Sequence, residues 1–102
     1  MKKPRIKAHK ANKPRFKVSV STDESTGKLI AAYLYVRAGK SVETIEIEED
    51  RAYADYDAAG QLIGVELLAP CHVKVLDRLT EKESDEVREF LHSSPPRSLV
   101  LA

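Results

Sequence analysis

The sequence predicts an α+β domain in which an antiparallel β-meander of about five strands is followed by one C-terminal helix. Three observations favour this fold class. Apolar and polar residues alternate in several short segments that precede Pro70, as they do in strands. Short runs of turn-forming residues separate these segments at roughly ten-residue spacing, which is typical of a meander. Beyond Pro70 the apolar residues adopt the spacing of an amphipathic helix.

Strands are expected in five places. Phe16, Val18 and Val20 alternate with polar residues, as in a strand with one face in water. Residues 28–37 carry apolar side chains on both faces, so this strand is expected to be central, although its alanines also allow a helix. The other strands are expected at 41–50, 52–57 and 61–68, and Pro70 ends the last of them because proline donates no ladder hydrogen bond.

The predicted helix runs from about Glu81 to His92. Thr80 and Glu83 have the spacing of a capping box, and the acidic first turns suit the helix dipole. Its apolar side consists of Val87, Phe90 and Leu91. Residues 71–79 fit either an edge strand or a connector.

Charge divides the chain into three expected parts: a basic flexible arm at 1–15, a single domain at 16–92 and a Pro-containing tail at 93–102. Eight of the 17 bases lie in the first 17 residues, which hold no acid, so nine bases and 16 acids remain. The arm has too few apolar residues to offset the entropy of ordering. The tail ends in an apolar tip, Leu99–Leu101, for which docking and fraying both remain open.

Composition predicts a cytoplasmic protein without a metal or cofactor. The chain is 42% hydrophobic and 32% charged, and no apolar run approaches the roughly 20 residues that cross a membrane. The charged N-terminus is not followed by the apolar core of a signal peptide. The single cysteine excludes an internal disulfide, and His9, His72 and His92 lack the spacing of a zinc site.

Catalysis is not expected. Cys71 and His72 are adjacent, but consecutive residues of an extended chain point to opposite faces and do not form a nucleophile and base pair. Asp55 and Asp57 are expected on one face of a strand, yet two carboxylates are too few for a calcium ion. The segment from Asp57 to Gly60 instead has the composition of a type I turn.

Residues 16–70 resemble the small bacterial proteins of domain-of-unknown-function family 2283. The resemblance rests on an aromatic-rich strand, a glutamate-rich strand, an Asp-Tyr-Asp turn that ends in Gly, and an Ile-Gly-Val-Glu-Leu strand. These features are carried by Tyr33, Leu34, Tyr35, Asp55, Tyr56, Asp57, Gly60, Ile63, Gly64, Val65, Glu66 and Leu67. The segment VSVSTDESTG lacks the Tyr-Asp pair with which this family usually opens. The resemblance implies a compact β-rich fold and no known activity.

The function expected from the sequence is a non-catalytic protein-interaction module that forms a homodimer or binds a small partner protein. A sheet with apolar residues on both faces of two strands needs more cover than one short helix provides. The predicted interface residues are Leu34, Val36, Ile63, Val65 and Leu67. The alternative is nucleic-acid or ribosome binding through basic residues, namely Lys2, Lys3, Arg5, Lys7, Lys10, Lys13, Arg15 and Lys17.

Overall fold

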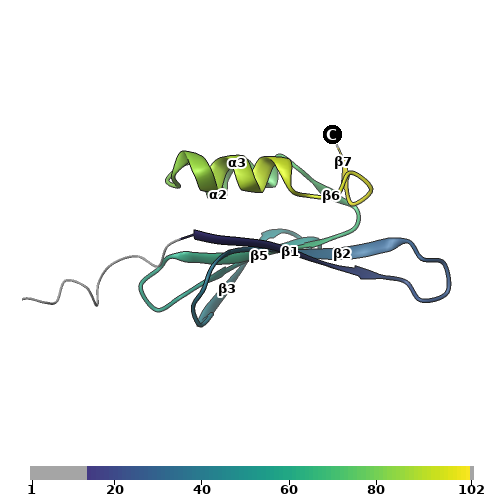
Figure 1. Cartoon of the computed structure of the whole chain (residues 1–102), viewed down its shortest axis with the longest axis horizontal. Helices are drawn as coiled ribbons and strands as arrows, with labels where there is room; N and C mark the ends of the chain where they lie inside the picture. Colours follow the sequence, from purple (N-terminus) through teal and green to yellow (C-terminus); the bar gives the residue numbers. More distant parts are fainter. Residues whose placement is uncertain (1–13, 102) are drawn as a thin grey trace, which may run out of the picture.

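The computed structural model describes residues 14–101, with the backbone alone at residue 101. The strands are β1 (Pro14–Thr22), β2 (Leu29–Arg37), β3 (Glu43–Glu48), β4 (Ala52–Tyr56), β5 (Leu62–Leu68), β6 (Cys71–His72) and β7 (Val100–Leu101), and the helices are α2 (Val75–Thr80) and α3 (Asp85–Ser93). The five longer strands form one antiparallel sheet, and both helices lie over the same face of it (Figure 1). The predicted combination of an antiparallel sheet with C-terminal helical structure is confirmed, but the single helix is wrong.

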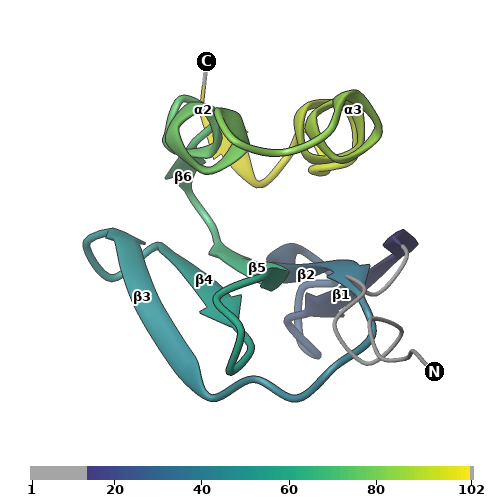
Figure 2. The same ribbon diagram turned by 90° about the vertical axis from the view of Figure 1, so that its left-hand side faces the viewer.

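The strands do not form a meander, because their order in the sheet is β1-β2-β5-β4-β3. After the β1–β2 hairpin, residues 38–42 carry the chain to the other edge, from which β3, β4 and β5 return to the middle (Figure 2). This order pairs β2 with β5, placing Leu34 opposite Val65 and Ala32 opposite Leu67. The two strands with apolar residues on both faces therefore lie inside the sheet, where burial contributes most. Residue alternation reveals the strands but not which of them pair.

The helical region is divided in two at a point that the capping-box interpretation did not identify. Ser84 is the N-cap of α3, and its side chain accepts a hydrogen bond from the Val87 backbone N–H. Thr80 ends α2 instead of capping a helix: it is buried, and its hydroxyl donates to the Asp77 carbonyl. The segment 71–79, which fitted a strand or a connector, contains β6 and most of α2.

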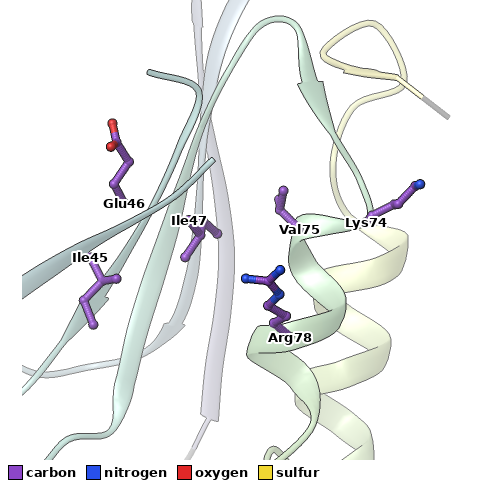
Figure 3. A pocket seen from close by; sticks show the side chains of 6 residues that line it. All are labelled: Ile45, Glu46, Ile47, Lys74, Val75 and Arg78. Carbon is purple, nitrogen blue, oxygen red and sulfur yellow. The ribbon is translucent and has the colours of Figure 1, made fainter. Parts of the chain in front are cut away.

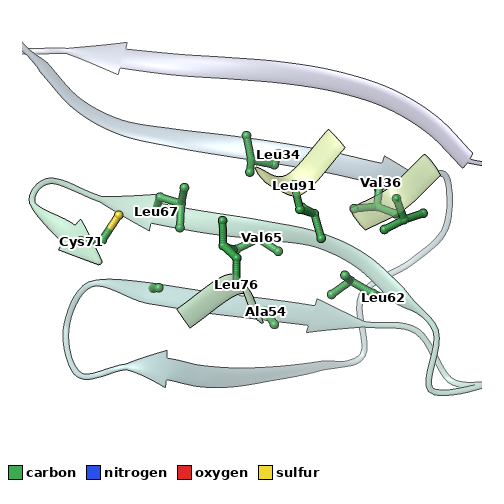
Figure 4. Packing of buried hydrophobic residues seen from close by; sticks show 11 residues of the cluster. Leu34, Val36, Ala54, Leu62, Val65, Leu67, Cys71, Leu76 and Leu91 are labelled. Carbon is green, nitrogen blue, oxygen red and sulfur yellow. The ribbon is translucent and has the colours of Figure 1, made fainter. Parts of the chain in front are cut away.

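One apolar core fills the space between the sheet and the helices (Figure 4). Leu34 and Val65 from the central strands pack with Leu76 of α2 and Leu91 of α3, and all four are fully buried. Asp55 pairs with Gly64 and Tyr56 with Leu62, so Ile63 is an extra residue in β5. This bulge turns Leu62, rather than Ile63, into the core cluster.

The C-terminal segment docks on the domain. Leu99 is fully buried, and its carbonyl accepts a hydrogen bond of 2.9 Å from the Cys71 backbone N–H. The two-residue strand β7 pairs in parallel with β6 at the same place. Of the two alternatives for the apolar tip, the structure shows the docked one. Leu99 thus extends the cover that the helices give to one face of the sheet.

Candidate interaction surfaces

The five residues predicted to form an interface lie inside the folded chain. Leu34, Val36, Ile63, Val65 and Leu67 are each at most 6% exposed. All except Ile63 belong to the core cluster beneath α2 and α3, and Ile63 lies at the bulge of β5. The second helix and the docked tail provide cover that the sequence interpretation assigned to a partner. An interface that uses these residues would require the domain to open.

The basic residues predicted to contact nucleic acid fall mostly outside the described part of the chain. Lys2, Lys3, Arg5, Lys7, Lys10 and Lys13 lie outside it. Arg15 and Lys17 lie in the exposed edge strand β1. The Lys17 Nζ is 4.8 Å from the centre of the Tyr35 ring, which is within cation–π range. Arg15 and Lys17 border a shallow pocket of about 250 Å³ together with Tyr35 and Arg37.

The face of the sheet opposite the helices, called the open face below, carries aromatic and charged side chains. Strand alternation and register place on it Lys17, Tyr33, Tyr35, Thr44, Tyr53, Asp55 and Glu66. The Tyr33 hydroxyl donates a hydrogen bond of 2.6 Å to Asp55 Oδ2, and the Thr44 hydroxyl donates one of 2.6 Å to Asp55 Oδ1. The first bond joins β2 to β4 across the intervening β5, and the second joins the neighbouring strands β3 and β4.

Gly64 allows the Tyr33 side chain to cross β5. A Cβ atom at position 64 would lie only 2.4 Å from Tyr33 Cε2, so the tyrosine ring rests directly over the glycine. Partial burial of this ring, together with the hydrogen bond to Asp55, raises the pKa of Tyr33 well above its usual value. Tyr33, Asp55 and Gly64, three of the residues that carry the family resemblance, therefore form one structural unit.

Asp55 and Asp57 have separate structural roles. Asp57 Oδ1 accepts hydrogen bonds from the backbone N–H groups of Ala59 and Gln61, and the Gly60 N–H donates to the Asp57 carbonyl. Gly60 has a φ of 82°, which favours glycine. The turn interpretation is confirmed for Asp57. Asp55 instead accepts hydrogen bonds from Tyr33 and Thr44 on the open face.

The substitution Tyr33→Phe is expected to lower the free energy of unfolding by about 1 kcal/mol at neutral pH, because it removes one hydrogen bond and keeps the ring. The folded chain holds the Tyr33 proton above the usual tyrosine pKa of 10.0, whereas the unfolded chain releases it there. The stability that this hydroxyl contributes is thus complete below pH 10 and declines as the pH rises further. Urea unfolding at a series of pH values should show the wild type and Tyr33→Phe converging in alkali.

Thr44→Ala provides the matched control for this prediction. It also removes a hydroxyl that donates to Asp55, but that hydroxyl does not titrate in the same range. Its loss of stability should stay nearly constant across the same pH series. Parallel profiles for the wild type and Tyr33→Phe would contradict the role given to the Tyr33 proton.

Cys71 and His72 diverge as expected for consecutive residues of an extended segment. Cys71 is fully buried with its Sγ 3.7 Å from the Leu99 carbonyl, and burial raises the pKa of its thiol. The exposed His72 contacts Glu48 instead, with 2.7 Å between Nδ1 and Oε2. The thiol is thus part of the packing around the docked tail.

An apolar stripe that sequence reasoning did not single out lies on the helix side of the β1–β2 hairpin. It consists of Phe16, Val18, Val20 and Ile30, which are 39%, 41%, 52% and 47% exposed. Its inner end is fixed by Phe16, whose ring stacks on Phe90 of α3 at a centroid distance of 4.5 Å. The hairpin extends past the helices, so its outer half receives no cover from them (Figure 1). The alternation of apolar and polar residues in β1 indicates an apolar face. Only the positions of the helices show that this face stays exposed.

A second surface is the groove between β3 and α2, a cavity of about 310 Å³. Figure 3 shows Ile45 and Ile47 on the strand side and Val75, Lys74 and Arg78 on the helix side.

Within residues 14–101 no cluster of three or more His, Cys, Asp or Glu side chains has a metal-binding arrangement. Among the described helices none is long and apolar enough to cross a membrane.

Comparison with known proteins identifies the central part of the chain. The family model described as "Protein of unknown function (DUF2283)" matches residues 31–69, which run from β2 to the end of β5, and this confirms the family resemblance. No curated protein and no solved structure matches the chain. The matched segment contains Tyr33, Asp55 and Gly64 of the open face, whereas all four residues of the apolar stripe lie before it.

Proposed function

We propose that this chain, whose residues 31–69 match DUF2283, is a protein-interaction module that self-associates through β1. The observation that supports this function is the outer edge of β1, which has no neighbouring strand among residues 14–101 and lies beside the exposed apolar stripe. Edge strands of soluble proteins usually carry charges that prevent pairing with another chain. From Phe16 to Thr22, β1 has one charged residue, Lys17.

The alternation in β1 suits antiparallel pairing with a second copy. In a two-fold arrangement centred on Ser19, Val18 lies opposite Val20 of the second copy on the helix side. Lys17 then lies opposite Ser21 of the second copy, so no like charges meet. The other edge strand, β3, carries Glu43, Glu46 and Glu48, and self-pairing there would bring carboxylates together. The geometry therefore favours β1 over β3 as the site of self-association.

The expected dimer is weak and depends on concentration. Covering the exposed part of one apolar side chain of the stripe contributes about 1 kcal/mol. Four such side chains in each copy are offset in part by the cost of association, about 4 kcal/mol or more. The net free energy of association is therefore small enough for a single charged residue in the stripe to abolish pairing.

The substitution Val20→Lys tests this function. The wild type is expected to change from monomer to dimer as its concentration rises in light-scattering measurements, whereas Val20→Lys should stay monomeric. Because Val20 is 52% exposed, the variant should retain the fold, which circular dichroism can check. Val42→Lys is the matched control, since Val42 is 58% exposed but lies outside the stripe, and it should dimerise like the wild type. A wild type that stays monomeric at every concentration would refute self-association.

Nucleic-acid binding through the basic N-terminus is the second candidate. Eight bases and no acid occur in the first 17 residues, and the exposed Lys17 lies over an aromatic ring next to Arg15. Neutralising several phosphates would make binding strongly salt-dependent. Deletion of residues 1–13 should then remove most retention on an RNA column while the Val20→Lys variant is retained normally. Unchanged retention after the deletion would reject this candidate.

A further inference from the structure

The groove between β3 and α2 combines an apolar floor with an unpaired strand edge. Ile47 and Val75 pack against the core from opposite walls, and Ile45 is 44% exposed at the mouth of the groove (Figure 3). β3 is the last strand of the sheet, so within the described chain its outer edge has no neighbour. An extended segment can add to such an edge through main-chain hydrogen bonds and place alternate side chains over the groove.

Two cations, one at the N-cap of α2 and one within it, border the groove. Lys74 and Arg78 are exposed, and neither forms an ion pair with a residue of the described chain. Two nearby acids contact other bases: Asp77 contacts His92 and Glu83 contacts Arg37.

The one acid that lines this groove is turned away from it. Glu46 points away from the isoleucines in Figure 3, and its Oε2 accepts a hydrogen bond from the Asp50 backbone N–H. The groove therefore presents the Arg78 guanidinium above apolar side chains. The exposed Lys74 side chain lies at its rim and points away from the isoleucines in Figure 3. This combination suits an acidic ligand with methylene groups.

The spacing of the two cations matches an extended chain. Lys74 and Arg78 are four residues apart, which corresponds to about 6 Å along a helix. Side chains on one side of a strand repeat at about 6.6–6.8 Å. Two carboxylates two residues apart on a strand beside β3 would therefore match the spacing of the two cations, once the exposed Lys74 side chain turns from the position it has in Figure 3 toward the groove.

We propose that this groove binds an extended acidic segment of a partner protein, which adds to β3 and directs two glutamates to Lys74 and Arg78. The methylene groups of the glutamates would pack on Ile45 and Ile47. Segments of this chain are poor occupants. Residues 1–13 contain six bases and no acid, and β3 of a second copy would oppose its own glutamates. The groove lies at the opposite edge from β1, so this inference is independent of the proposed self-association.

A pair of labelled peptides with exchanged charge tests the proposal on the full chain. A short peptide of alternating threonine and glutamate should bind in fluorescence anisotropy, and the same peptide with lysine for glutamate should bind at least about tenfold more weakly. The variant Lys74→Glu with Arg78→Glu should reverse this preference. The matched control, Lys28→Glu with Lys40→Glu, makes the same change in net charge at exposed positions outside the groove and should keep the wild-type preference.

Three results would overturn the proposal. The first is no saturable binding of the acidic peptide, and the second is the same loss of binding in both double variants, which would indicate a general charge effect. The third is a smaller dimer fraction for the Lys74→Glu, Arg78→Glu variant in light scattering, which would assign the groove to a second copy. Failure of self-association at β1 would leave the peptide result unchanged, so the two proposals can be rejected separately.

Discussion

Replacing Leu34 with alanine is expected to lower the free energy of unfolding by about 2–5 kcal/mol. Leu34 is fully buried between β5 and the two helices, and it lies in the core cluster with Val65, Leu76 and Leu91. Truncation removes three carbon atoms from a closely packed region and leaves a cavity that fixed strands close only in part. For a domain of this size the loss is a large share of the total stability.

Ile30 provides a control on the same strand and the same face. It is 47% exposed because the hairpin extends past the helices, so Ile30→Ala should cost less than about 1 kcal/mol. Urea unfolding of both variants at low protein concentration measures the difference without a contribution from dimers. Equal losses would contradict the arrangement in which the helices cover only the inner half of β2. A Leu34→Asp variant should fail to fold, since the core cluster of the described residues is apolar and offers no partner for a charge.

Replacing Gly64 with alanine is expected to cost about 1–3 kcal/mol, although alanine is normally preferred to glycine within a strand. The new methyl group would lie 2.4–2.6 Å from the ring and hydroxyl atoms of Tyr33. The ring must then leave its position over β5, and its hydrogen bond to Asp55 is lost. The cost therefore has two sources, overpacking and a broken link between β2 and β4.

A double-mutant cycle separates this clash from a general effect of alanine at position 64. In a Tyr33→Ala background the methyl group has free space, so Gly64→Ala should be neutral or stabilise the domain by up to about 1 kcal/mol. The four proteins can be compared by urea unfolding at neutral pH. A cost for Gly64→Ala that is the same in both backgrounds would show that the tyrosine ring does not require the glycine. Such a result would remove the structural explanation for this part of the family pattern.

The two edges of the sheet support different kinds of partner. From Phe16 to Thr22, β1 carries two valines and one charged residue, Lys17, which permits pairing with an identical strand. The glutamates of β3 disfavour pairing with an identical strand, whereas Lys74 and Arg78 border the groove beside it and suit the acidic segment proposed above. The two surfaces lie at opposite edges of one sheet, so occupation of one does not block the other.

Local patterns in the sequence were sufficient to determine the five longer strands, the turn at Asp57 and the amphipathic nature of the C-terminal region. These features depend on neighbours two to four residues apart, so periodicity and turn composition report them directly. The alternation of residues 29–37 also showed correctly that this strand is central. The role of Asp57 as an acceptor of backbone hydrogen bonds in the turn followed from its position ahead of Gly60, without knowledge of the rest of the chain.

Only the tertiary structure decided the strand order, the division of the helical region and the location of the exposed surfaces. Leu34 and Ile30 have the same alternation and similar hydrophobicity, yet one is core and the other is exposed, because the β1–β2 hairpin extends past the helices. Likewise, Asp55 meets Tyr33 only because β5 inserts between β2 and β4 and has a glycine at the crossing. Burial and cross-strand contacts depend on residues far apart in the chain, and the periodicity of one segment contains no information about them.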